Sequence, residues 1–125
     1  MTGILMQSKI SKKIKVELAS TPQQIQFGLM YRKSINSDSG MLFVFGNKDR
    51  RSFWGANTYI PLDIAFINDN KIVDIKKIVP LSTKPVKCEE LCDKALEVSA
   101  NFFENNGIKV GSSVEIDKDE IAFLM

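Results

Sequence analysis

The stretch 60–79, IPLDIAFINDNKIVDIKKIV, decides the fold, because it holds two apolar strands and the turn between them. Residues 60–67 predict the first strand and residues 71–79 the second. The Asn-Asp-Asn sequence at 68–70 predicts a tight turn, since Asn and Asp tolerate the positive φ that a hairpin requires. An antiparallel hairpin is therefore the firmest local prediction.

Several more short strands follow from the pattern of apolar residues. Apolar and charged residues alternate over 14–18, the period of a half-buried strand, and residues 41–45 are apolar throughout, as in a buried one. Many short strands with one or two brief helices predict a mainly β fold, either an antiparallel β-sandwich or a partly open, jelly-roll-like barrel. Further strands are expected at 94–98, 108–110, 114–116 and 121–124, after an irregular connection at 80–93.

The two short helices are predicted from the residues at their beginnings. The sequence Thr-Pro-Gln-Gln at 21–24 has the pattern of a capping box with proline in the first turn, and Arg32 is expected at the helix end. Gly28 would cost such a helix about 1 kcal/mol relative to alanine, so either its backbone is closely packed or the helix is short. A second helix is expected at 99–107.

Size and charge define the class of protein. A chain of 125 residues with 44% hydrophobic side chains fits one domain at 14–125, preceded by a flexible N-terminal arm at 1–13. The net charge of +2 comes from basic and acidic residues mixed along the chain, so no nucleic-acid partner is expected. There is neither an apolar run of transmembrane length nor a signal peptide, so the chain as it stands is expected to be soluble and cytoplasmic.

Histidine and cysteine usage excludes several chemistries. The chain has no histidine, which rules out Ser-His-Asp and Cys-His catalysis and His-ligated catalytic zinc within one chain. Cys88 and Cys92 are the two cysteines, too few soft ligands for a structural zinc site. Buried thiols without function are favoured over a local disulfide, and redox catalysis is the least favoured alternative. No metal, no cofactor and no catalytic residue is therefore assigned.

Asp63 is the first candidate functional residue, because it lies inside an apolar strand. Strand alternation places Asp63 on one face with Ala65 and Ile67, where an unpaired carboxylate would cost several kcal/mol. Arg32, at the end of the first helix, is the preferred partner. A structural ion pair and a ligand-facing acid both remain open.

A small cluster just before this strand supplies the other candidates. Trp54 offers a platform for a sugar, peptide or other flat ligand, although a lone Trp is more often a core or rim side chain. Asn57 and Thr58 offer hydrogen bonds beside it, or equally satisfy the backbone of a turn. Pro61 cannot donate to a sheet, which places the cluster at a rim. The candidate ligand-binding residues are Arg32, Trp54, Asn57, Thr58 and Asp63.

Glu97 repeats the pattern of one acid in an apolar strand. Paired with Asp63 it would suggest a two-carboxylate hydrolase, which requires a separation of about 5 to 9.5 Å. This pairing is the weaker interpretation, because Glu on the outer face of a strand is ordinary.

The chain resembles the uncharacterised DUF192 family, also called UPF0127, over about residues 16–116. The resemblance implies a compact, mostly β domain of jelly-roll-like or barrel character, often exported in bacterial members. The matching blocks are Glu17-Leu18-Ala19, Thr21-Pro22, Gly28-Leu29-Met30-Tyr31-Arg32, Gly40-Met41-Leu42-Phe43-Val44-Phe45, Phe53-Trp54 with Asn57-Thr58, Ile60-Pro61-Leu62-Asp63-Ile64, Leu96-Glu97-Val98, and Gly107-Ile108 with Gly111.

Three departures from the family pattern bear on the site. Gly55 and Ala56 stand where the family usually has Met-Lys, which removes a cation beside Trp54. Asn101 stands where Gly is usual, which indicates a positive φ that Asn also tolerates. Ser112 replaces a common Asp near the last turn.

These observations favour a small binding module with a rim pocket near Trp54, Asn57 and Asp63, whose partner is a small polar ligand, a saccharide or a peptide. A protein-interaction or assembly domain is the first alternative, and a His-free carboxylate-dependent hydrolase is the second. The oligomeric state is left open.

Overall fold

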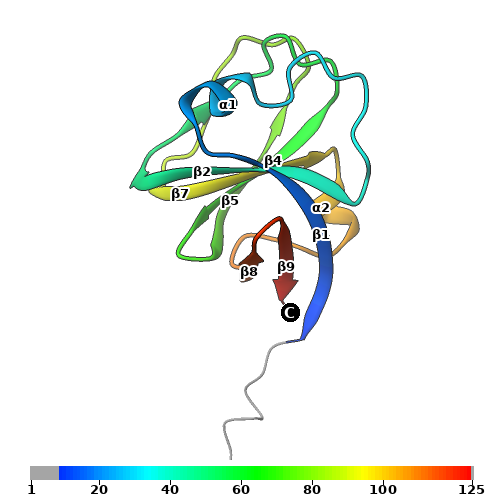
Figure 1. The fold of residues 1–125 in the computed structure, drawn as a ribbon, viewed down its shortest axis with the longest axis vertical. Coiled ribbons are helices and arrows are strands. Elements are labelled where there is room, and N and C mark those ends of the chain that lie inside the picture. Colours follow the sequence, from blue (N-terminus) through cyan, green and yellow to red (C-terminus); the bar gives the residue numbers. More distant parts are fainter. Residues whose placement is uncertain (1–8, 125) are drawn as a thin grey trace, which may run out of the picture.

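The computed structural model describes residues 9–124 (Figure 1). Within this range neither helix has the length and hydropathy needed to span a membrane. Residues 10–13 of the predicted arm belong to the first strand, and residues 1–8 of the arm lie outside the described range. In chain order the elements are β1 (Ile10–Ala19), α1 (Pro22–Phe27), β2 (Ser39–Asp49), β3 (Ser52–Phe53), β4 (Leu62–Asn68), β5 (Lys71–Ile78), β6 (Val86–Lys87), β7 (Cys92–Ser99), α2 (Phe102–Asn105), β8 (Val114–Asp117) and β9 (Glu120–Leu124).

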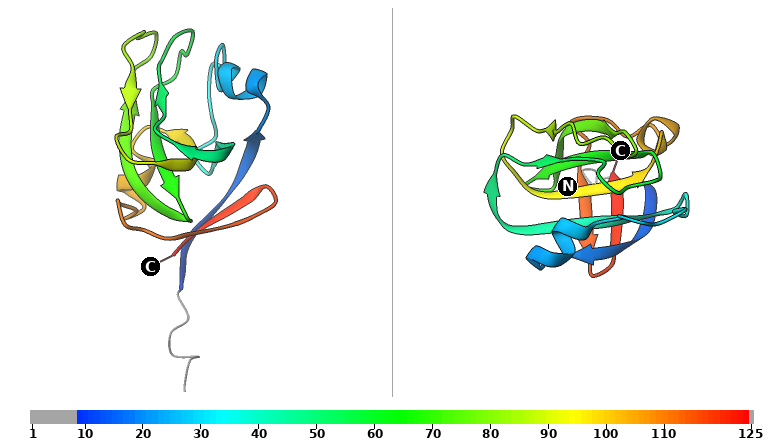
Figure 2. Two further views of the ribbon diagram at one scale, coloured as in Figure 1. Left: turned by 90° about the vertical axis from the view of Figure 1, so that its left-hand side faces the viewer. Right: turned by 90° about the horizontal axis from the view of Figure 1, so that it is seen from above.

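Most of the strands form one curled sheet (Figure 1 and Figure 2). The seven-stranded sheet has the order β5-β4-β7-β2-β1-β9-β8, and β3 pairs with β6 in a separate two-stranded sheet. An antiparallel bridge between Lys71, at the start of β5, and Ser113, just before β8, brings the two edges of the large sheet together. The result is a partly open barrel, which confirms the predicted mainly β fold.

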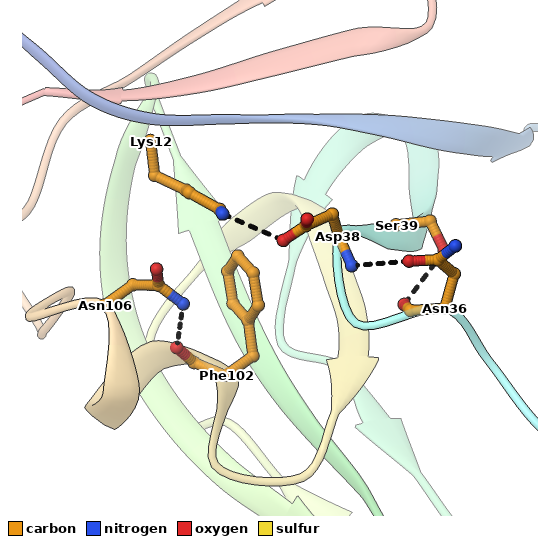
Figure 3. Close-up of polar contacts among 6 residues, drawn as sticks. All are labelled: Lys12, Asn36, Asp38, Ser39, Phe102 and Asn106. Atoms are coloured by element: carbon orange, nitrogen blue, oxygen red, sulfur yellow. Dashed lines mark hydrogen bonds and ion pairs between the residues drawn. The ribbon is translucent and has the colours of Figure 1, made fainter.

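One pair of strands departs from the antiparallel pattern. β1 and β2 run parallel, because the chain crosses over through α1 and the following loop before it enters β2. Polar contacts hold this crossover against β1 (Figure 3). Lys12 Nζ on β1 lies 2.8 Å from Asp38 Oδ1, and the Asp38 N–H donates to Asn36 Oδ1 at 3.0 Å. These contacts fix the start of β2 just before Gly40, which pairs with β1.

The predicted hairpin is present as β4 and β5. Their antiparallel register runs from Leu62 opposite Ile78 to Asn68 opposite Lys71. Asp69 and Asn70 have φ values of 49° and 61°, the positive values that the turn requires. The short polar turn therefore confirms the sequence prediction in its chemistry as well as its position.

Apolar side chains on the two faces of the sheet form two separate clusters. The inner cluster fills the barrel and includes Leu42, Ala65 and Phe123, with two phenylalanines of α2 packed into it. The outer cluster includes Phe43 and Ile64 and lies on the opposite face of the central strands. Because β4 contributes to both, all of residues 62–67 are buried.

The first helix is shorter than predicted. Its capping box is formed as expected, with the Gln24 N–H donating to Thr21 Oγ1 at 3.2 Å and the Thr21 N–H donating to Gln24 Oε1 at 3.2 Å. Helix α1 nevertheless ends at Phe27, because Gly28 adopts φ 52° and ψ −130°, a conformation that glycine tolerates best. The prediction that Arg32 ends this helix is wrong.

The second helix is also shorter than predicted. It covers Phe102–Asn105 within the expected range 99–107. Asn101, rather than Ser99, precedes it with φ 70°, which confirms the positive φ inferred at this position. The strand expected at 108–110 is wrong, because this segment forms the loop that leads from α2 to the β5 edge.

Candidate functional site

A cavity of about 480 Å³ lies on the outer face of the sheet, between the central strands and the segments that cover them. Its floor comes from β2 and β7, one side from α1 and the turn after it, and the other from β3 with the residues that flank it. The lining residues are Pro22, Ile25, Gln26, Phe27, Gly28, Leu29, Met30, Phe43, Phe45, Arg51, Ser52, Phe53, Trp54, Thr58 and Glu97.

Glu97 is the buried carboxyl group of this cavity. It lies on β7, opposite Met41 of β2 and Ile64 of β4, and only 5% of the residue is exposed. Burial alone raises the pKa of Glu97 to about 8, because neither a cation nor a hydrogen-bond donor lies close enough to favour its charged form. At neutral pH its side chain is therefore mainly a neutral carboxylic acid that faces the cavity.

Gly28 forms part of the wall close to this acid. A Cβ added at Gly28 would lie 3.4 Å from Phe43 Cζ and 3.8 Å from Glu97 Oε1. Any larger residue would therefore extend toward the carboxyl group, and the φ of 52° would strain it as well. Gly28 thus ends α1 and keeps the space above Glu97 free.

Aromatic rings make the remainder of the wall largely apolar. Phe53 packs edge to face against Phe43, with ring centroids 5.0 Å apart, and against Phe45 at 6.2 Å. Trp54 and Phe27 are about half exposed and lie where the cavity meets solvent. Such a wall suits a ligand with an apolar or aromatic body.

Arg51 is the charged side chain of the cavity wall. Its guanidinium lies 4.1 Å from the centroid of the Phe45 ring, and Nη2 donates to the carbonyl and Oδ1 of Asn47, each at 2.7 Å. Its Nε is buried without a hydrogen-bond partner among residues 9–124. Arg51 therefore brings a positive charge to the cavity wall.

Two of the five predicted ligand-binding residues line this cavity, namely Trp54 and Thr58. Thr58 is buried, and its hydroxyl donates to the carbonyl of Ala56 at 3.3 Å, as in the turn interpretation. Asn57 is exposed with φ 56°, and its carbonyl accepts the Tyr31 N–H at 2.8 Å. Asn57 therefore supports the rim backbone and is not one of the lining side chains.

Asp63 and Arg32 lie elsewhere, and the predicted pair between them is wrong. Asp63 accepts hydrogen bonds from Lys77 Nζ at 3.2 Å and from the Asn101 N–H at 3.1 Å. Arg32 instead forms a bidentate ion pair with Glu17 on β1. That pair lowers the pKa of Glu17 and raises the pKa of Arg32, in each case mainly through the hydrogen bond between them.

The Asp63 and Glu97 side chains point to opposite faces of the sheet. Asp63 pairs with Val98, an inner-cluster residue, whereas Glu97 pairs with Ile64 of the outer cluster. Directly opposed residues share a face in an antiparallel pair, so the two carboxyl groups cannot face one reacting centre. The two-carboxylate hydrolase is therefore wrong in this form.

The sequence interpretation underweighted Glu97 and missed Arg51. Glu97 was compatible with an exposed outer face, and only the covering by α1 and β3 buries it. Arg51 stood among charged residues of a loop, where a solvated side chain is the usual expectation. A usable signal was that Ala95, Leu96 and Val98 around Glu97 are apolar on both faces of the strand.

Both cysteines are free and buried beside this site. Burial raises the pKa of Cys88 and raises the pKa of Cys92 to about 11, while nearby Arg51 opposes the shift at Cys92. Neither thiol is therefore activated as a nucleophile. Within residues 9–124, the His, Cys, Asp and Glu side chains form no group of three or more with the spacing of a metal site.

The fold and cavity define a small mainly β domain with a candidate ligand pocket beside its central strands. The chain belongs to the DUF192 family, described as "Uncharacterized ACR, COG1430", whose model matches residues 4–116. No curated protein matches the chain.

Two solved structures are similar to it over most of their length. A proposed transcription regulator from Sinorhizobium meliloti 1021 is 38% identical, with a TM-score of 0.80 and coverage of 82% of this chain and 81% of that one. A protein of unknown function from Novosphingobium aromaticivorans DSM 12444 is 33% identical, with a TM-score of 0.79 and coverage of 82% and 75%. Both support the fold and leave the function open.

Proposed function

We propose that this domain is a binding module that takes a small organic ligand into the cavity above Glu97. The observation that carries the proposal is the position of the Glu97 carboxyl group, which lines the cavity with only 5% of the residue exposed. Burial raises its pKa, and no charged or hydrogen-bonding neighbour opposes this shift. Buried polar groups are normally hydrogen-bonded, and exceptions often have a functional reason. A bound ligand would supply the missing partner.

The size and lining of the cavity support a small ligand. A volume of about 480 Å³ lies within the range of roughly 300 to 1,000 Å³ that is usual for small-molecule sites. Phe43, Phe45, Phe53 and Trp54 offer apolar contact, while Glu97 offers one well-placed polar group. This combination of an apolar wall and few polar groups is typical of such sites.

Tryptophan fluorescence tests the proposal directly, because Trp54 is the single tryptophan of the chain and lies at the cavity mouth. We expect a saturable change in emission with at least one member of a panel of small acids, amides, amines, saccharides and short peptides. Amide chemical shifts should then move at Gly28, Ser52 and Glu97. Glu115→Gln, on the exposed surface of β8, is the matched control and should bind equally.

The proposal fails if no panel member at millimolar concentration changes Trp54 emission or these amide shifts. It also fails if the shifts gather around Asp63 on the other face of the sheet while the cavity amides stay unmoved.

A second candidate function is protein interaction through the aromatic rim. Phe27, Tyr31 and Tyr59 are each about half exposed, with ring centroids 5.8 Å apart for the first pair and 6.1 Å for the second. Exposed aromatic groups of this kind are enriched at interfaces. Light scattering over a concentration series of the wild type and Tyr59→Ser tests this: self-association should weaken in the variant, and a monomer at every concentration speaks against association between copies.

A further inference from the structure

Two polar side chains of the cavity wall, Arg51 and neutral Glu97, offer hydrogen-bond donors. The Arg51 guanidinium has N–H donors and no acceptor. Glu97, while neutral, has an O–H to donate. The Thr58 hydroxyl donates to the Ala56 carbonyl, so its own hydrogen is already used. A ligand that engages Glu97 and Arg51 together must therefore bring acceptors to both.

The net charge of the cavity wall also favours a ligand with hydrogen-bond acceptors, in particular an anion. Among the lining side chains of the described residues, Arg51 alone carries a charge when Glu97 is neutral. The neighbouring Glu17–Arg32 pair lies on the other side of α1 and compensates its own charges. A sphere of the cavity's 480 Å³ is about 10 Å across, comparable with the screening length of about 8 Å at physiological salt. A bound anion would therefore experience the field of Arg51 anywhere in the cavity.

Resting on the proposed function, we infer that the cavity selects small carboxylic acids with an apolar, aromatic-sized body. Glu97 donates its O–H to the ligand carboxylate, and Arg51 balances the ligand's negative charge. A hydrogen bond from a neutral acid to a carboxylate is among the stronger kinds in proteins. The rings of Phe43, Phe53 and Trp54 enclose the body of the ligand.

An ammonium ligand is the clearest competing class, because aromatic walls also attract cations. It would require Glu97 to lose its proton and would share the cavity with the positive charge of Arg51. The two classes predict opposite dependence on pH. A cation would bind more tightly as pH rises to 8, whereas a carboxylate would bind less tightly above 8.

Three probes with one body and different head groups separate these classes: 3-phenylpropionate, 3-phenylpropanamide and 3-phenylpropylamine. We expect the acid to bind at least tenfold more tightly than the amide or the amine at pH 6.5, by calorimetry and Trp54 fluorescence. N-acetylphenylalanine and its amide extend the comparison to a peptide C-terminus, and the carboxylate form should again be preferred.

Variants test the two named residues. Glu97→Gln retains a donor and should keep most of the affinity, whereas Glu97→Met should lose about tenfold or more. Arg51→Met should weaken binding of the acid and leave the amide unaffected, and Arg51→Lys should retain the preference for the acid. Arg50→Met removes a neighbouring exposed charge and is the matched control.

The dependence on pH gives an independent readout. Affinity of the wild type for 3-phenylpropionate should be constant from pH 6 to 7.5 and fall about tenfold per unit above pH 8, while Glu97→Gln should show no such fall. Tighter binding of the amine, or of the acid with rising pH, would overturn the inferred ligand class and leave the pocket as a binding site. If no probe binds and no member of the wider ligand panel binds either, the proposal that this cavity is a binding site is overturned.

Discussion

Glu97 should make the folded protein less stable as pH rises, and Glu97→Gln should abolish this effect. The pKa of the carboxyl group is about 8 in the folded protein, against 4.5 for an exposed glutamate. Between these values the unfolded chain has released the proton and the folded chain still holds it. The stability associated with this raised pKa is thus fully present below pH 4.5 and is lost as pH increases through 8.

The magnitude follows from the size of the shift. The difference between 8 and 4.5 is about 3.5 units, which corresponds to a free-energy change of about 5 kcal/mol above pH 8. At pH 7 the loss is about 3 kcal/mol, because the range from pH 4.5 to pH 7 covers only part of the shift from 4.5 to 8. This is a large fraction of the roughly 5 to 15 kcal/mol that stabilises a typical domain.

Urea unfolding of the wild type and Glu97→Gln at intervals from pH 4 to 9 measures the effect. The two proteins should have similar stability near pH 4, and the variant should gain on the wild type by about 1.4 kcal/mol per pH unit up to pH 8. Glu115→Gln, which changes an exposed glutamate, should follow the wild type throughout. Parallel stability curves for the wild type and Glu97→Gln would refute the burial argument, because all other ionisable groups are common to both proteins.

Two further predictions concern residues outside the cavity. Asp63→Asn should lower the free energy of unfolding by about 1 to 3 kcal/mol, because Lys77 Nζ and the Asn101 N–H donate to different carboxylate oxygens and asparagine replaces one of these with an NH2 group that cannot accept. An unchanged urea midpoint would contradict this structural role. Cys88 and Cys92 should not react with a thiol reagent in the folded protein at pH 8, since both are buried with raised pKa values, and both should react in denaturant; rapid modification of the folded protein would contradict it.

The features of the fold that could be predicted are those that depend on residues adjacent in the sequence. The hairpin follows from Asn-Asp-Asn at 68–70, and the start of α1 from the capping box at 21–24. The length of α1 was not predictable, because Gly28 is compatible with a helix interior and its actual φ depends on packing against Phe43 and Glu97. The parallel pairing of β1 and β2 joins residues far apart in the chain, such as Lys15 and Ser39, and no local pattern specifies it.

The candidate site could likewise be predicted only in part: residue type indicated Trp54, whereas the acid near it depends on the three-dimensional arrangement of the strands. Trp54 was identified from its type, and it does line the cavity, but its partner acid was assigned by proximity in sequence. Asp63 is only nine residues from Trp54, yet strand alternation turns it into the barrel, where Lys77 pairs with it. Glu97 is far from Trp54 in the sequence, and the two line one cavity because β3 and the residues that flank it lie against the face of the sheet to which Glu97 points. The covering of a strand by a distant segment is a long-range property, so the acid that lines the cavity could be nominated from the sequence but not ranked first.

We propose binding rather than catalysis for the cavity because of the groups that line it. A neutral carboxylic acid with a pKa of about 8 could in principle donate a proton, but general acid catalysis also needs a group that attacks or stabilises the reacting atom. Among the described residues of the wall, Glu97 is the sole carboxyl group, and the Thr58 hydroxyl donates to a backbone carbonyl rather than to a base. Arg51 supplies a fixed positive charge, which favours retention of an anion. A donor, a cation and an aromatic wall together form the arrangement on which the proposed ligand binding rests.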